Sequence, residues 1–492
     1  MTVIDPRTPV LVGVGQCSPA ERTAETSPLA LMTAAARQAF ADTGAPAATV
    51  LEHVESVGVT DSVSWSAPDP GRVLADELGA SPAETVTTNI SGTSPLDLVA
   101  DVCERIVRGQ FDVALLAGAE TVNALQEGRL TAPAEQPADA APARTLGTDR
   151  HPSHPAEEAA GLYLPIHFYP LFENAIRAAA GRDITAHERS IAQLWARFAE
   201  VAKTNPHAWD STAPDARTIE AVGPRNRMVS FPYRKLTVAN IHVDQGAAFV
   251  VCSAAAAKTM RIPRERWVFV HATGEAHDHW YVGERANLHR SPAIKAVGDA
   301  VLAHAEIGIG QVDLLDLYSC FPSAVQIAAV ELGVNLADPH RSPTVTGGLT
   351  FAGGPGSNYV LHSLATLTER IREDPASTGL ATAVGWFLTK HAAVLLSGRP
   401  PARGYAHHDV QDEVDSQPRR AIAEGYQGPA TVETYTVGYG RDSIPATAHI
   451  ACLLADGRRA FASSREPDVV ARMLSDDPIG TTVTLADDAR FT

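Results

Sequence analysis

The segment SPLDLVADVCERIVRGQFDVALLAGAE, residues 94–120, decides the fold class of this chain. Its first part, 94–109, is typical of a helix and stops at Gly109, a residue type that commonly ends helices. Its second part, 111–120, is a short apolar run typical of a buried strand. A helix directly followed by a buried strand is the unit from which parallel sheets are built.

The same alternation extends in both directions from this segment. Upstream, the pattern predicts strands over 8–15, 55–63 and 84–90 and helices over 28–44 and 70–79. After a strand and helix over 246–257, a second series predicts strands over 267–276, 312–321, 344–354, 379–388 and 391–398, with helices over 291–307, 322–333 and 357–373. The chain is therefore predicted to be an α/β protein of two similar halves.

The remaining segments predict the domain boundaries. We expect the first half at 1–262 with a loop domain inserted at 121–240, the second half at 263–399, a linker at 400–428 and a small β-domain at 429–492. Alternating strands with one short helix favour an OB-like β-barrel for the last of these.

Composition excludes several classes of protein. The 492 residues include 57 acidic and 40 basic side chains, a net charge of −17, and no basic run, so nucleic acid is not an expected partner. No stretch of 18 apolar residues predicts a membrane span, and the N-terminus has no cationic signal-peptide region. Five scattered cysteines with no CxxC pair argue against disulfides and structural zinc, and predict a cytoplasmic protein.

Four segments in a fixed order resemble the thiolase superfamily, and most closely the thiolases of the sterol-carrier-protein-X type and their actinobacterial thiolase-like relatives. The segments are VRGQFDVALLAGAE (107–120), NRMVSFPYRKLTVANIHVDQGAAFVVCSA (226–254), DLLDLYSCFPSAVQ (313–326) and TGGLTFAGGPGSNY (346–359). The resemblance covers about residues 8–398. It implies two βαβαβαββ halves in α-β-α-β-α layers, with a loop domain that helps to bind coenzyme A in relatives.

The resemblance also implies three catalytic groups that this chain lacks. The family's nucleophilic cysteine falls on Gly92, the histidine of its Gly-His-Pro loop on Gly354, and its second cysteine near Val384 or Gly385. Cys103 lies nine residues inside the helix and cannot replace the nucleophile. The hydroxyls nearest the nucleophile position belong to Ser91, Thr93 and Ser94, which we interpret as the N-cap of the helix because a hydroxyl nucleophile would need a base. Ordinary thiolysis is therefore not expected.

Two loop tyrosines suggest a different chemistry. Tyr318 stands where relatives have Asn or His, in Tyr-Ser-Cys-Phe, and Tyr359 and His362 follow in the next loop. The thiolase-fold retro-aldolases, which work with an OB-fold partner, are similar in having a Tyr-Asp-x-Phe loop and a Gly-x-x-Tyr segment, although Ser319 stands here in place of Asp. The candidate catalytic residues are Tyr318, Tyr359, Cys320 and His362, and the alternative is that the tyrosines only fill an emptied pocket.

Other polar clusters predict no metal site. His151, His154, Glu157 and Glu158, then His277-Asp278-His279, then His407-His408-Asp409 all lack helical metal-ligand spacing, so we interpret them as solvated loops. Lys390-His391 follows a strand and receives no role.

Two functions remain open at this point. The first is an enzyme of altered acyl-transfer or retro-aldol chemistry, acting on an acyl-CoA or a sterol-derived CoA ester. The second is a non-catalytic acyl-CoA or lipid-binding protein, or a partner subunit. In both cases we expect a coenzyme A thioester as substrate or ligand, no tightly bound cofactor, and a monomer or homodimer.

Overall fold

A computed structural model describes residues 4–19, 22, 24–130 and 140–492. Its main sheet has 11 strands, in the order β10-β11-β12-β9-β1-β8-β4-β2-β3-β5 with β13 beside β9. The first half contributes β1 (Pro9–Cys17), β2 (Ser56–Val59), β3 (Glu84–Thr88), β4 (Val113–Thr121), β5 (Arg144–Leu146) and β8 (Asp244–Ser253). The second contributes β9 (Val268–His277), β10 (Leu314–Asp316), β11 (Thr378–Gly385), β12 (Lys390–Ser397) and β13 (Ala406–Asp409). The two half-sheets meet where β1 pairs antiparallel with β9.

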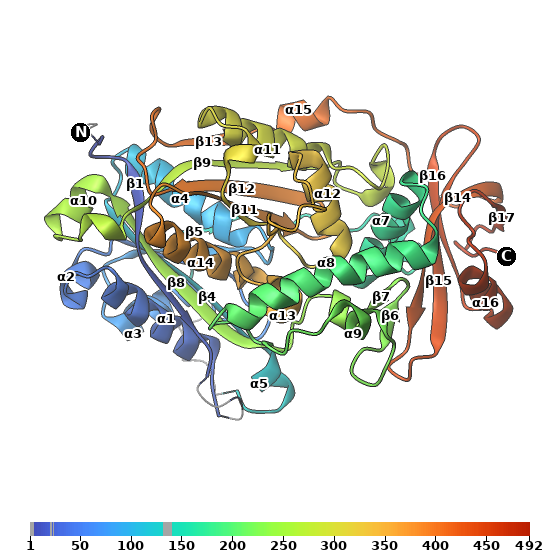
Figure 1. The fold of residues 1–492 in the computed structure, drawn as a ribbon, viewed down its shortest axis with the longest axis horizontal. Helices are drawn as coiled ribbons and strands as arrows, with labels where there is room; N and C mark the ends of the chain where they lie inside the picture. The colour runs from blue at the N-terminus through green and yellow to red at the C-terminus, as the bar shows by residue number, and fades with distance from the viewer. Residues whose placement is uncertain (1–3, 20–21, 23, 131–139) are drawn as a thin grey trace.

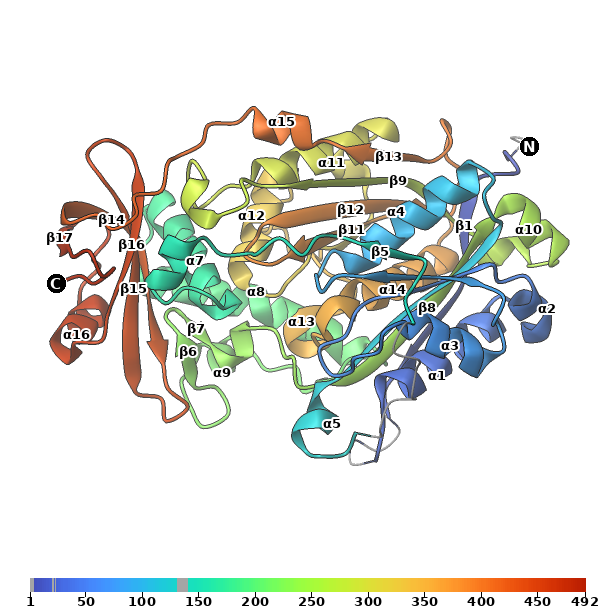
Figure 2. The same cartoon turned by 180° about the vertical axis from the view of Figure 1, so that it is seen from behind.

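The helices form three layers around these two half-sheets (Figures 1 and 2). The first half has α1 (Pro28–Asp42), α2 (Ala47–Glu52), α3 (Pro70–Leu78), α4 (Ser94–Val107) and α10 (Ala254–Thr259), and the second has α11 (Pro292–His304), α12 (Pro322–Leu332) and α14 (Tyr359–Glu373). Helices α4 and α14 contact each other and strands of both halves, so they form the middle layer. The predicted α/β fold in α-β-α-β-α layers is confirmed.

One predicted strand is wrong. Residues 344–354 form a turn and the short helix α13 (Gly348–Phe351), so the second half lacks the strand expected there. Gly347 and Gly348 both adopt the left-handed region, with φ of 101° and 74°, which breaks an extended chain. The hydroxyls of Thr344 and Thr346 bond to Asp316 at 2.7 and 3.2 Å, which fixes this turn against the end of β10.

The segment inserted after β4 lies across the second half. It holds α5 (Val122–Gln126), α6 (Pro155–Ala159), α7 (Pro165–Ala179), α8 (Ile184–Thr204), α9 (Ala216–Glu220), β6 (Met228–Ser230) and β7 (Tyr233–Arg234). The long helix α8 crosses the front of the molecule in Figure 1. The segment 400–428, expected as a linker, instead supplies β13 to the main sheet and α15 (Gln411–Asp415).

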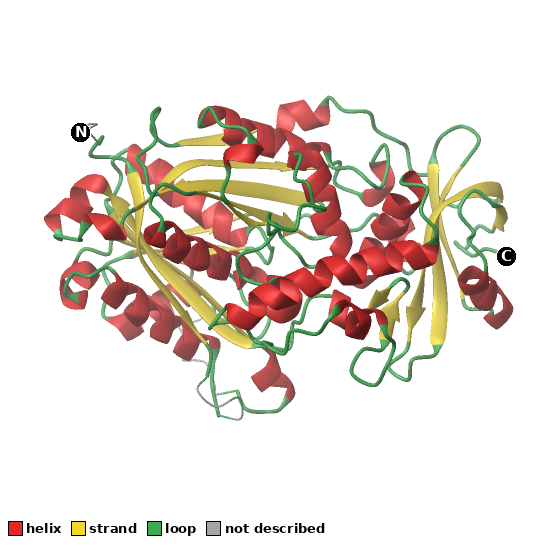
Figure 3. Ribbon diagram, viewed as in Figure 1, coloured by secondary structure: helices red, strands yellow, loops and turns green. Residues whose placement is uncertain are grey.

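The C-terminal region builds a second sheet at one end of the molecule (Figure 3). Strands β14 (Gly428–Tyr439), β15 (Pro445–Leu453), β16 (Arg459–Ser464) and β17 (Thr482–Leu485) accompany α16 (Pro467–Ser475). The strand order is β16-β15-β14-β6-β7, with β17 paired to β14, so two strands come from the inserted segment. A C-terminal antiparallel sheet is thus present. Strand β16 also forms isolated parallel bridges with Ile422 and Arg490, and an OB-like barrel stays a prediction.

A buried arginine joins this sheet to the core. Arg459 on β16 is completely buried and pairs with Glu433 on β14 through two contacts of 2.6 and 2.7 Å. Its third nitrogen donates to the backbone oxygens of Gly283 and Arg285, at 3.0 and 2.6 Å. Those residues belong to the loop between β9 and α11, so one side chain links the two sheets.

A buried glutamate beside this joint gives a pH prediction. Glu157 accepts the backbone N–H groups of Gly283 at 2.7 Å and His154 at 2.8 Å, and burial raises its pKa from 4.5 to about 7. Between those pH values the unfolded chain releases the proton that the folded chain retains. The free energy of unfolding therefore falls as pH rises through this window, by on the order of 3 kcal/mol. We expect the loss of melting temperature between pH 5 and pH 7 to shrink in Glu157→Gln but not in the exposed neighbour variant Glu158→Gln. Equal pH profiles for both variants would contradict the assignment.

Candidate functional site

Two of the three positions identified by spacing, Gly92 and the Val384–Gly385 pair, meet at the N-terminal end of α4, whereas Gly354 lies against Ala239 and Asn240. A Cβ atom added to Gly92 would lie 2.5 Å from the hydroxyl oxygen of Tyr318 and still closer to the backbone oxygen of Val384. One added to Gly385 would collide with the hydroxyl of Ser91. At Gly92 and Gly385 the structure therefore leaves no space for a larger side chain without movement of these neighbours.

The hydroxyls around Gly92 form local hydrogen bonds, and one of the three predicted capping residues occupies the N-cap position. Thr93 is the N-cap residue of α4, and its side chain makes no capping bond. Ser91 Oγ instead accepts the backbone N–H of Thr93 at 3.2 Å, and Ser94 Oγ donates to the backbone oxygen of Asn89 at 2.8 Å. These bonds shape the tight approach to the helix, which the sequence pattern of Ser and Thr does not distinguish from capping.

The rings of Tyr318 and Tyr359 pack against each other, and the Tyr359 hydroxyl bonds to buried groups. The rings lie 5.6 Å apart and nearly perpendicular, at 89°. Tyr359 Oη donates to Asp316 at 2.9 Å and bonds Thr346 at 2.7 Å, and its side chain is 1% exposed. Burial raises the pKa of both phenols above the usual value. Both groups therefore stay protonated at neutral pH, which favours the interpretation that they fill the emptied centre.

Cys320 and His362 lie in separate surroundings. Burial raises the pKa of the half-buried Cys320 thiol to about 12, so it is not a thiolate at neutral pH. His362 is buried between Gln16, at 2.9 Å from Nδ1, and Asn358, at 3.2 Å from Nε2. Burial lowers its pKa to about 3, so the imidazole is neutral. The four candidate residues do not line either cavity described below.

A cavity of about 890 Å³ lies between the inserted segment and the second half. Helices α7 and α8 form one wall and α12 with the loop after it forms the other. Its wall is apolar at Leu194, Ile327 and Val330, and its charged members are the arginines Arg182, Arg197 and Arg290. No carboxylate from the described part of the chain belongs to this wall. Sequence reasoning missed the cavity because its two sides are more than a hundred residues apart.

The three arginines differ in availability. Arg290 is paired with Glu331 at 2.6 and 2.9 Å, and Arg197 donates to the backbone oxygens of Asp338 and Arg341 at 2.9 and 2.8 Å. Arg182 is exposed and has one long contact, 3.5 Å, to Ser190. Arg182 therefore offers one available guanidinium beside the apolar wall of the cavity. This combination suits an amphipathic anion, whose charged group would bind the guanidinium and whose apolar part would contact the wall.

The predicted solvated loops are partly wrong. Asp278 is 2% exposed and accepts from Ser291 Oγ at 2.6 Å and Ala293 N at 3.1 Å, so it fixes the start of α11. His407 and Asp409 lie on strand β13 and line a second cavity, together with Lys390. Among the residues the structure places, no group of three His, Cys, Asp or Glu side chains could hold a metal ion.

Comparison with known proteins identifies the family. A crystal structure of a monomeric SCP2-thiolase-like protein type 1 from Mycobacterium smegmatis is 32% identical over 100% of both chains, with a TM-score of 0.86. The chain belongs to the SCP2-thiolase-like proteins of type 1. Residues 409–490 match the model of the additional C-terminal domain of thiolase-like protein type 1.

More distant structures share the thiolase fold of this family. An Ltp2–ChsH2(DUF35) aldolase is 18% identical over 80% of this chain and 98% of that one, with a TM-score of 0.61. Human mitochondrial 3-ketoacyl-CoA thiolase in complex with CoA is 13% identical over 80% and 99%, with a TM-score of 0.57. No curated protein sequence matches the chain. Along the described chain, no helix of this thiolase-like protein is both long and apolar enough to cross a bilayer.

Proposed function

We propose that this thiolase-like protein binds an acyl-CoA thioester without thiolysis, at the cavity between the inserted segment and α12. The observation that carries the proposal is the composition of that 890 Å³ cavity, an apolar wall with arginines and no carboxylate among the described residues, in a chain of net charge −17. Arginine recognises phosphate groups by paired hydrogen bonds, and the apolar wall offers burial to an acyl chain.

Loss of thiolysis in this proposal is supported by the closed centre at Gly92. Tyr318 and Val384 occupy the space that a cysteine side chain would need, and the neighbouring hydroxyls form only local bonds. Retro-aldol cleavage with Tyr318 and Tyr359 is the alternative, and the observation that favours it is the contact between these two rings. Their buried hydroxyls favour binding over catalysis.

Titration of the protein with acyl-CoA esters, followed by mass analysis of the esters, distinguishes binding from turnover. We expect calorimetry to show saturable binding of medium- and long-chain acyl-CoA esters, and mass spectrometry to recover those esters and β-hydroxyacyl-CoA esters unchanged. Arg182→Glu should weaken binding at least about tenfold, since it replaces the available cation by an anion. Arg37→Glu is the control, because Arg37 is 66% exposed and outside the cavity. Turnover that is lost in Tyr359→Phe would establish the alternative, and absence of binding would refute the proposal.

We further propose that the protein is a monomer in the cytoplasm. Strand β5 of the same chain pairs in parallel with β3 over Val86–Thr88 and so covers an edge of the main sheet that another subunit could otherwise extend. All five cysteines are free, which suits a reducing compartment. Light scattering is expected to give the mass of one 52.0 kDa chain, and a stable dimer would contradict this.

A further inference from the structure

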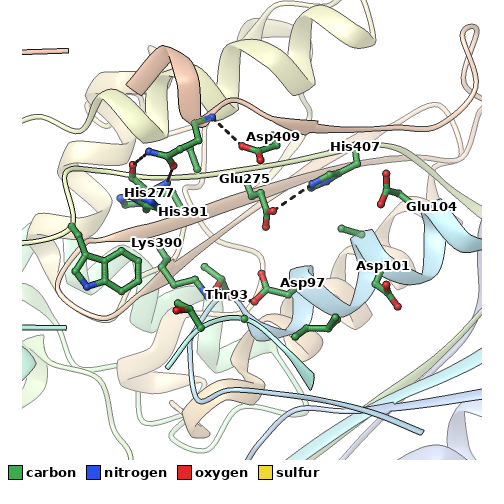
Figure 4. Close-up of a pocket in the computed structure, with 17 residues that line it drawn as sticks. Thr93, Asp97, Asp101, Glu104, Glu275, His277, Lys390, His391, His407 and Asp409 are labelled. Atoms are coloured by element: carbon green, nitrogen blue, oxygen red, sulfur yellow. Dashed lines mark hydrogen bonds and ion pairs between the residues drawn. The ribbon is translucent and has the colours of Figure 1, made fainter. Parts of the chain in front are cut away.

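A second cavity, of about 490 Å³, lies between the middle-layer helix α4 and the half-sheet of the second half (Figure 4). One side is a face of α4, and the other is the sheet surface made by β9, β12 and β13. Such layers normally pack through apolar side chains, since charged groups lose hydration there. This layer instead holds charged side chains from both sides, and that departure requires an explanation.

The fold itself aims these side chains at one another. Asp97 and Asp101 repeat at helical spacing along one face of α4. On the sheet, Glu275 of β9 lies beside Asp409 of β13 in register, and His407 is two residues before Asp409 on the same face. Lys390, at the start of β12, projects toward Asp97 in Figure 4.

Two ion pairs face each other within this cavity. Lys390 Nζ lies 3.5 Å from Asp97, with side chains 15% and 10% exposed, and His407 Nε2 lies 3.6 Å from Glu275. Both separations exceed the roughly 2.7–2.9 Å of a direct charge-assisted hydrogen bond. The interaction with His407 lowers the pKa of Glu275. Burial acts to lower the pKa of His407, but its interaction with Glu275 outweighs burial and raises that pKa. Burial raises the pKa of Asp97, which Lys390 opposes. By their distances, both pairs are loosely closed.

The other carboxylates of the cavity already have partners. Asp101 is paired with Arg144 and lies 3.8 Å from Arg105, and Glu104 is paired with Arg108 at 2.9 Å. Asp409 accepts the backbone N–H of Gln411 at 3.0 Å. What remains to face a ligand is therefore two basic side chains, Lys390 and His407, opposite two acidic ones, Asp97 and Glu275.

We propose that this cavity binds a small zwitterion, a molecule that carries one ammonium group and one carboxylate, such as an amino acid. A ligand with one kind of charge would meet a like charge at short range whichever way it entered. A zwitterion places its ammonium group at Asp97 and Glu275 and its carboxylate at Lys390 and His407. Ala100, Leu146 and Trp280 complete the wall and leave room for a small apolar side chain.

This inference does not depend on acyl-CoA binding. The two cavities share no residue among those the structure describes, so either ligand can fail while the other binds. Acyl-CoA titration of the variants below should match the unmodified protein.

The test uses the full chain and compares ligands that differ by one charge. The probes are the common α-amino acids and 4-aminobutyrate, screened by saturation-transfer NMR and measured by calorimetry. Butyrate and butylamine are the matched analogues of 4-aminobutyrate without the ammonium group and without the carboxylate. At least one zwitterion is expected to bind saturably, and singly charged analogues should bind at least about tenfold more weakly.

Variants then assign the two ends of the ligand. Lys390→Met and Glu275→Gln should each weaken zwitterion binding at least about tenfold, whereas Lys390→Arg should retain it. Lys295→Met and Glu306→Gln are controls, because those side chains are 54% and 64% exposed elsewhere on the surface. Unchanged melting temperatures would verify that the variants fold. If Lys390→Met does not fold, the proposal is tested by Glu275→Gln and by whether Lys390→Arg retains binding.

Three results would overturn the proposal. The first is no saturable zwitterion binding at millimolar concentration. The second is equal binding of butyrate, butylamine and their zwitterionic parent. The third is tighter amine binding in Lys390→Met, which would show a cation site whose anion is simply freed by the substitution.

Discussion

Arg459→Met is expected to lower the free energy of unfolding by about 3 kcal/mol, because it removes the completely buried partner of an ion pair whose carboxylate, Glu433, is 15% exposed. The remaining carboxylate of Glu433 would lose two charge-assisted hydrogen bonds, and the backbone oxygens of Gly283 and Arg285 would lose a donor. These oxygens lie in the core, so the C-terminal sheet should separate from it before the core unfolds. Urea denaturation and hydrogen exchange along β14 to β16 measure the two effects.

Arg458 provides a matched control for this prediction. It is the preceding residue, is 43% exposed, and pairs with Asp456 at the surface. Arg458→Met should change stability by less than about 1 kcal/mol, as is usual for surface ion pairs. Adding Glu433→Leu to Arg459→Met should recover part of the loss, since it removes the unpaired buried charge. Equal stability of the Arg458 and Arg459 variants would refute the role of Arg459 as the joint.

Gly92→Cys is expected to cost about 3 kcal/mol and to restore no thiolase activity. The new side chain would overlap the hydroxyl of Tyr318 and the backbone oxygen of Val384, and only the first of these can move. Tyr318→Ala should therefore relieve part of the cost, which a double-mutant cycle of unfolding free energies measures. We also expect the family's activating histidine to be missing, because the resemblance places it at Gly354.

Gly310→Ala is the control for Gly92, since a Cβ there meets nothing within 4 Å. Its cost should be small. Two findings would contradict the closed centre. One is a Gly92→Cys protein as stable as the unmodified chain. The other is an acylated thiol at the substituted position, detected by mass spectrometry after incubation of that variant with acetyl-CoA.

The order of strands and helices was predictable because each element repeats its burial pattern locally. The run 94–120 gives α4 and β4, and residues 28–44 give α1, with ends displaced by a few residues. Where glycines break the chain, that reasoning failed: apolar residues in 344–354 resemble a strand, but Gly347 and Gly348 hold a left-handed turn. A side-chain pattern reports burial, and it does not report the backbone angles that two adjacent glycines permit.

The sequence by itself determined the two-half α/β core, because helices and strands repeat their side-chain patterns locally. The absence of the thiolase cysteines and histidine is what the family resemblance implies, and it stays a prediction. Only the tertiary structure decided that Tyr318 closes the centre at Gly92, that β6 and β7 complete the C-terminal sheet, and that Lys390 and His407 face α4. Those facts depend on contacts between residues far apart in the chain. Local sequence patterns do not predict such contacts, because packing and charge pairing in the folded state determine which distant residues meet.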